Sequence, residues 1–162
     1  MDISTKYNDY ANIGYEFLTY LYYNANTSID INYELGKKIV FAKFVNDKIY
    51  EKTVISGEDS DTLSGDLLLS EGALVIEMQL ILNLDSQIPI YIKTKDFNFS
   101  GIKMPKLEEG DDNDFLYRID YVDQALNYFD FIFDEFIKLR ISNEWEDKRM
   151  EIINYANQNN RQ

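Results

Sequence analysis

Lysine and aromatic residues alternate along the segments of this chain that are best suited to form β-strands. Because successive side chains of a strand point to opposite faces, residues two positions apart share a face. Ammonium groups attract phosphates and tyrosine rings stack on bases, so such a surface suits a nucleic-acid strand. We predict a nucleic-acid-binding surface made of Lys43, Lys48, Tyr50, Lys52, Tyr91, Lys93 and Lys95. The alternative is the ordinary polar face of a sheet, on which lysines protect the edges from aggregation.

Acidic residues dominate the segment from Glu108 to Glu135, in which Arg118 is the single base. Four residues spaced by three and four positions share one edge of the helix predicted there: Asp123, Asn127, Asp130 and Asp134. A row of carboxylates on a rigid helix can imitate the phosphates of DNA. The alternative function is therefore an acidic interaction or inhibitor protein that presents residues 108–135 to a basic partner. A solvated helix face is the simpler interpretation of the same pattern.

The composition removes most catalytic chemistry. The 162 residues include no His and no Cys, which excludes imidazole and thiol catalysis, disulfides and the usual zinc sites. Asp66 followed by the triplet Glu77-Met78-Gln79 imitates the order of metal-dependent nucleases, but Gln stands where those enzymes need lysine. We interpret Glu77 and Gln79 as the solvent face of a strand. We therefore expect a non-enzymatic protein with no cofactor and no metal.

The charge balance is strongly acidic. Asp and Glu number 29 against 16 Lys and Arg, which gives a net charge of −13 at pH 7. This balance disfavours indiscriminate adhesion to nucleic acid or to anionic lipid. The apolar stretches are shorter than the ~20 residues that span a bilayer, and the first residues lack a secretory pattern. We expect a cytoplasmic protein that does not contact a membrane.

The hydrophobic pattern predicts a helix followed by a run of strands. Apolar residues recur every three or four positions from Tyr10 to Asn24, which indicates one helical face. Strands are predicted over 28–35, 38–45 and 48–55. The two-residue links Gly36-Lys37 and Asn46-Asp47 are typical of hairpins.

The second half of the chain predicts more strands and then helices. We expect a short helix over 60–71 that stops at Gly72, strands over 73–84 and 88–95, and helices over 117–141 and 144–157. The order predicts an α+β fold, with an antiparallel sheet of about five strands. The N-terminal helix and the two C-terminal helices should pack on one face. We expect residues 1–162 to form a single domain with frayed ends over 1–9 and 157–162.

Residues Ile13 to Tyr23 read IGYEFLTYLYY. This segment resembles a Gly-x-Glu-Phe-Leu-(Thr)-aromatic-Leu-aromatic element of bacterial proteins similar to the recombination-associated protein RdgC. The order of elements after it is also similar, up to a helix that ends Lys138-Leu139-Arg140. The resemblance spans about Ile13 to Trp145 and covers only the C-terminal part of that family.

This resemblance implies non-enzymatic binding of double-stranded DNA by a ring-shaped dimer with a basic inner surface. Such binding would modulate recombination. The chain departs from the family in lacking its larger N-terminal portion and in being strongly acidic. The expected partners are therefore DNA or a DNA-binding protein. A homodimer is a further expectation, with the tyrosines of the first helix as its interface if they are exposed.

Overall fold

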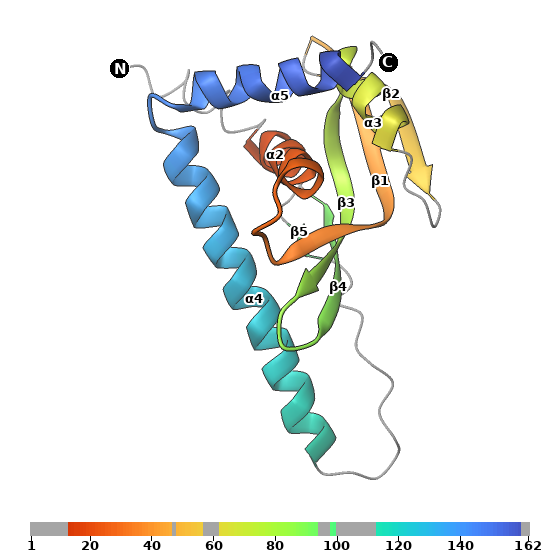
Figure 1. Cartoon of the computed structure of the whole chain (residues 1–162). Helices are drawn as coiled ribbons and strands as arrows, with labels where there is room; N and C mark the ends of the chain where they lie inside the picture. The colour runs from red at the N-terminus through yellow and green to blue at the C-terminus, as the bar shows by residue number, and fades with distance from the viewer. Residues whose placement is uncertain (1–12, 47, 57–61, 94–97, 100–112, 160–162) are drawn as a thin grey trace.

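The computed structural model describes residues 13–46, 48–56, 62–93, 98–99 and 113–159 (Figure 1). The elements are α2 (Ile13–Thr27), β1 (Tyr33–Val45), β2 (Lys48–Ser56), α3 (Thr62–Ser70), β3 (Leu74–Asn83), β4 (Gln87–Lys93), β5 (Asn98–Phe99), α4 (Asn113–Arg140) and α5 (Trp145–Asn159). The strands form one sheet in the order β2-β1-β3-β4-β5, and every neighbouring pair is antiparallel. The expected α+β class is confirmed.

The number and limits of the strands differ from the prediction. The predicted strands 28–35 and 38–45 are one strand, β1, and the expected hairpin at Gly36-Lys37 is wrong. The link instead forms an irregularity within β1, where the pairing with β3 shifts between Leu35 and Ile39. Four long strands remain, and the short edge strand β5 was not predicted. The hairpin at Asn46-Asp47 is confirmed by the pairing of Val45 with Lys48.

The side chain of Gln79 packs against the irregularity at Gly36. The Gln79 side-chain oxygen accepts a hydrogen bond of 2.8 Å from the backbone N–H of Lys37, which satisfies a donor that the shifted pairing leaves over. A Cβ atom at position 36 would lie 2.6 Å from Cγ of Gln79. Glycine is therefore needed for close approach of a side chain from β3, and not for a turn.

The helices cover one face of the sheet and enclose the main core. In Figure 1, α2 lies between α4 and the strands, and α5 runs across one end of these layers toward α3. The Phe17 ring of α2 contacts the rings of Phe129, Phe133 and Phe136 of α4, with centroids 5.1 to 5.6 Å apart. The sheet contributes Ile39, Phe41, Met78, Leu80, Leu82, Ile88, Ile90 and Ile92 to the same core. Burial of these apolar side chains is the main favourable contribution to folding.

With Glu77 and Gln79 on the solvent face, regular alternation predicts Val75 on that face and Ile76 in the main core, but a register shift in β3 reverses these two residues. From Glu77 onward the predicted alternation is correct, with Met78, Leu80 and Leu82 buried in the main core. The pairing with β1 skips Ile76, so Val75 and not Ile76 joins the main core. The freed N–H of Val75 donates a hydrogen bond of 3.0 Å to Thr19 Oγ1, which attaches α2 to β3.

The expected short helix is confirmed as α3, and its two glycines have separate roles. Gly65 is buried beside the hydroxyl of Tyr22. A Cβ atom at this position would collide with that hydroxyl, so only glycine fits here. That hydroxyl donates a hydrogen bond of 3.0 Å to Oδ1 of Asp66, a carboxylate that is 2% exposed. Gly72 follows the helix with φ of 91°, a left-handed conformation that favours glycine and ends the helix.

The two C-terminal helices are present, but the sequence pattern misplaced some of their apolar residues. Helical spacing of apolar residues predicts Leu126 beside the buried stripe of α4, but its side chain is 40% exposed. In α5, of the apolar residues Trp145, Met150 and Ile153, only Trp145 is buried, and the other two are partly exposed. Ile152 and Ala156 are buried instead and were not predicted. α5 continues to Asn159, so residues 157–159 are helical.

None of the helices in the described ranges is both long and apolar enough to cross a membrane.

Candidate functional site

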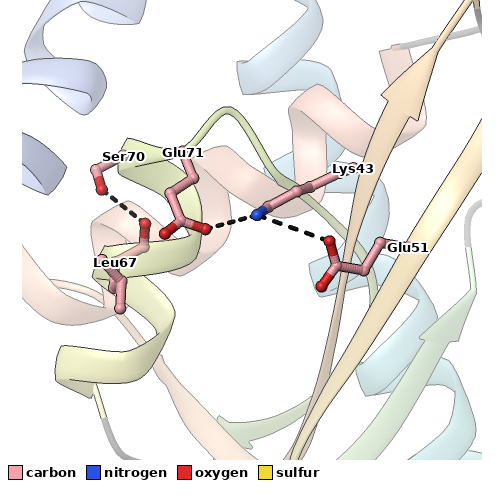
Figure 2. A network of polar contacts seen from close by, with 5 residues as sticks. All are labelled: Lys43, Glu51, Leu67, Ser70 and Glu71. Carbon is pink, nitrogen blue, oxygen red and sulfur yellow. Dashed lines mark hydrogen bonds and ion pairs between the residues drawn. The ribbon is translucent and has the colours of Figure 1, made fainter.

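Lys43 lies on the helix-covered face of the sheet, where acidic neighbours neutralise it. Its Nζ is 2.6 Å from Glu71, which follows α3, and 3.8 Å from Glu51, its cross-strand neighbour in β2 (Figure 2). The hydrogen bond and charge of Glu71 raise the pKa of Lys43. Strand alternation puts Lys43 on the same face as Phe41, a residue of the main core. It therefore does not belong to the same surface as Tyr91 and Lys93.

The open face of the sheet, which is the face opposite the main core, brings together two lysines around one tyrosine. Nζ of Lys93 and Nζ of Lys38 lie 5.6 and 5.5 Å from the centre of the Tyr91 ring. The Tyr91 hydroxyl donates a hydrogen bond to Glu77, the cross-strand partner of Lys93. Burial, followed by this hydrogen bond and the charge of Glu77, raises the pKa of Tyr91. Lys38 was not among the predicted site residues, although the predicted strand 38–45 begins with it.

The other predicted members of the lysine surface do not all converge with this group. Lys52 pairs with Ala42 and shares the open face. A register shift between Lys43 and Phe44 leaves Tyr50 without a pairing partner in β1, so the alternation from Lys52 to Lys48 is interrupted. The expectation that Lys48, Tyr50 and Lys52 share one face is therefore wrong. Lys95 lies outside the described residues.

The ring and the hydroxyl of Tyr91 already have partners within the fold. Lysine ammonium groups already lie over the ring, and the hydroxyl is bound to Glu77. A base that stacks on Tyr91 would have to displace these groups. The carboxylate of Glu77 would also repel a phosphate. We define Lys38, Lys52, Tyr91 and Lys93 as the lysine–tyrosine surface.

The helix α4 presents a row of acidic side chains to solvent. Asp123, Asn127, Asp130 and Asp134 are all exposed, and their spacing puts them on one edge. No ion pair joins Asp123, Asp130 or Asp134 to another residue in the described part of the chain. We call these four residues the acidic edge.

Apolar side chains are exposed beside the acidic edge. Phe131 is 58% exposed and Leu126 is 40% exposed, and both lie within one turn of Asp130. The first turns of α4 extend past the β3–β4 hairpin (Figure 1), and there Leu116, Tyr117 and Ile119 are exposed. Exposed aromatic and aliphatic residues next to charged ones are typical of protein–protein interfaces.

A groove of about 220 Å³ lies between the acidic edge and the end of α2. Its aromatic walls are Tyr20, Tyr33, Tyr128 and Phe131. Two carboxylates, those of Asp30 and Glu135, line it, and none of its described lining residues is basic. Burial raises the pKa of Tyr128 and of Tyr33, so both phenols stay neutral. An aromatic groove with two carboxylates suits a cationic side chain.

The nuclease-like pattern is not assembled. Asp66 is buried beneath the helices against Tyr22, whereas Glu77 lies on the open face. Because the sheet separates the two carboxylates, they cannot hold one metal ion. Among the described residues, no group of three or more acidic side chains is arranged to hold a metal.

No protein-family model matches the chain, no curated protein matches it in sequence, and no solved structure matches it in fold. The resemblance to the RdgC family therefore stays a prediction.

Proposed function

We propose that this chain is a non-enzymatic binding protein that docks a basic polypeptide on the acidic edge of α4. The observation that carries the proposal is the exposure of Asp123, Asp130 and Asp134 on one rigid edge, without ion pairs among the described residues. Carboxylates at this spacing, with Cβ atoms about 5–6 Å apart, offer a regular row of negative charge. A partner that binds nucleic-acid phosphates through lysine and arginine would recognise such a row.

The groove beside the acidic edge supports the same partner chemistry. An arginine or lysine of the partner would enter between Tyr128 and Phe131 and meet the carboxylates of Asp30 and Glu135. The only described base near these carboxylates is Lys138, which contacts Glu135 at 3.4 Å in an exposed pair. Such an exposed pair contributes little and is readily exchanged for a partner's cation.

The test compares charge reversals at two places with a labelled arginine-rich peptide as the probe. The variant Asp123→Lys, Asp130→Lys, Asp134→Lys should bind the peptide about a hundredfold more weakly, because attraction becomes repulsion at the docking row. The matched control reverses three exposed acids outside α4, Glu34, Glu144 and Asp147. The control should lose less than about fivefold, because it makes the same change in net charge at a distance. Equal losses in both variants would mean that only bulk charge attracts the peptide, and would refute the proposal.

A second candidate function is weak binding of a nucleic-acid backbone by the lysine–tyrosine surface. It is favoured by the convergence of Lys38 and Lys93 over Tyr91, and it retains the DNA association that the resemblance to RdgC implies. Few cations take part, so we expect binding only at low salt. Retention of single-stranded and duplex oligonucleotides at low salt should disappear in Lys38→Gln, Lys93→Gln and persist in Lys43→Gln. The candidate is excluded if the unmodified chain retains neither oligonucleotide.

Homodimer formation remains a separate proposal, but the first helix does not favour it. The rings of Tyr15, Tyr20 and Tyr23 are half-buried and contact Phe44, Phe136 and Tyr155, respectively. The projecting start of α4 is the more exposed apolar surface. Light scattering of the full chain measures the oligomeric state.

A further inference from the structure

A cavity of about 300 Å³ lies between α2, α5 and the turn from α3 into β3. It shares no lining residue with the acidic edge, the groove or the lysine–tyrosine surface. Its volume is at the lower end of the range for small-molecule sites, which is roughly 300–1,000 Å³. The walls are mainly apolar and consist of Leu69, Ala73, Leu74, Trp145, Ile152, Ile153 and Ala156.

Small residues keep this cavity open. Ala73 and Ala156 are buried in its wall, where larger side chains would fill the space. At Gly72, a Cβ atom would meet no other atom within 4 Å. The left-handed φ of Gly72 excludes most other residues from this position. The space beside Gly72 therefore results from the way in which this glycine ends α3.

The polar groups of the wall are already occupied, with one exception. The Thr19 hydroxyl donates its single proton to the carbonyl of Tyr15 and accepts from the N–H of Val75, so it has no donor left for a ligand carboxylate. The carboxylate of Glu16 accepts a hydrogen bond of 2.6 Å from Nε of Arg140, and both side chains are 22% exposed. This close pair neutralises the negative charge in the wall.

Arg149 provides the remaining charge. Arg149 is one of the residues that line the cavity, and its guanidinium contacts Glu146 at 3.3 Å in a pair whose side chains are both exposed. An exposed pair of this kind contributes little to stability, so a ligand carboxylate can replace Glu146. Arginine binds a carboxylate through two parallel N–H donors. The cavity thus combines an apolar body with one cationic group at its wall.

We infer that this cavity binds a medium-chain fatty acid, with its alkyl chain against Trp145 and Ile152 and its carboxylate on Arg149. The inference does not depend on the proposed docking function, because the two sites share no residue. Apolar burial would supply most of the affinity. The guanidinium would set the preference for an acid over an alcohol or an amine of equal length.

The single tryptophan of the chain gives a direct measurement, because Trp145 lines the cavity and is 6% exposed. The full chain is titrated with octanoate, octanol and octylammonium while tryptophan fluorescence is recorded. Octanoate should saturate the signal and bind about tenfold more tightly than octanol, because only the acid pairs with Arg149. Octylammonium should bind most weakly. A titration without a saturable change for octanoate would overturn the inference.

Two charge reversals distinguish the guanidinium from general charge. Arg149→Glu should weaken octanoate at least about tenfold and leave octanol within about twofold, because only the charged group loses its partner. Arg118→Glu makes the same change in net charge on an exposed turn of α4 and should leave octanoate unchanged. Equal octanoate affinity of the Arg149→Glu variant and the unmodified chain would refute the inference. Arg149 is exposed, so its replacement should preserve folding, and circular dichroism checks this.

Discussion

The lysines of the sheet and the aspartates of α4 differ in how far the fold has already neutralised them. Lys43 is held by two glutamates, and Lys38 and Lys93 lie over Tyr91 beside Glu77. The aspartates of the acidic edge have no such partner among the described residues. A charge with a partner inside the fold must exchange that partner before it binds another. The carboxylates of the acidic edge are therefore more available to a second molecule than the lysines of the sheet.

The largest expected effect concerns the rate at which a basic peptide binds. Raising the salt concentration from roughly 10 mM to 500 mM should slow association of an arginine-rich peptide about a hundredfold, because salt screens the field of the acidic edge. Stopped-flow fluorescence measures this rate. The triple lysine variant of the acidic edge should lose most of the salt dependence. If the unmodified chain shows a rate that does not change with salt, the contrast between the two surfaces has no consequence for binding.

The next largest effect tests whether the exposed Phe131 ring of α4 contributes to peptide binding in addition to the carboxylates. Phe131→Ala should weaken peptide binding about tenfold, because an exposed aromatic residue beside the groove would anchor the partner. The free energy of unfolding should change by less than about 0.5 kcal/mol, since Phe131 contributes little to the core. Isothermal calorimetry and urea denaturation measure the two quantities. Tyr117→Ala, an exposed aromatic outside the groove, is the control, and an equal loss there would place the anchor elsewhere.

A smaller effect is expected from reversing a neutralised lysine of the sheet. Lys43→Glu should lower the midpoint of thermal unfolding by about 3 °C, because it sets three carboxylates close together. Lys52→Glu changes an exposed lysine of the same strand pair and should lower the midpoint by less than about 1 °C. Circular dichroism follows both transitions. Equal shifts would mean that Lys43 is no more engaged than Lys52.

The smallest effect concerns the Tyr91 phenol on the open face. Its pKa is raised, so the stability from its neutral form is complete below the ordinary value of 10.0 and is lost as the pH rises through the raised pKa. Glu77→Gln removes a charge that raises this pKa, so the Tyr91 pKa should fall toward its ordinary value. Stability should then fall less steeply with alkaline pH. NMR titration of the Tyr91 ring measures the shift, and Glu34→Gln should leave it unchanged.

Local sequence patterns predicted most helices and strands but not the pairing that assigns their faces. Alternation correctly separates Met78 from Glu77, yet a single skipped residue in the pairing moves Val75 into the main core and Ile76 out of it. A glycine beside a lysine suggested a turn at Gly36, where the structure has the side chain of Gln79 instead. Such errors arise because bulges depend on contacts with residues more than forty positions away, which no local window contains.

The sequence by itself determined the α+β order, the acidic row at helical spacing on α4, and the exclusion of histidine and cysteine chemistry. These properties depend on residue type and short-range period, which a linear chain already contains. Only the tertiary structure decided which charges stay available. Glu71, the nearer partner of Lys43, lies 28 positions away, and Glu16, the partner of Arg140, lies 124 positions away. The physical reason is that neutralisation depends on distance in space, and folding sets that distance.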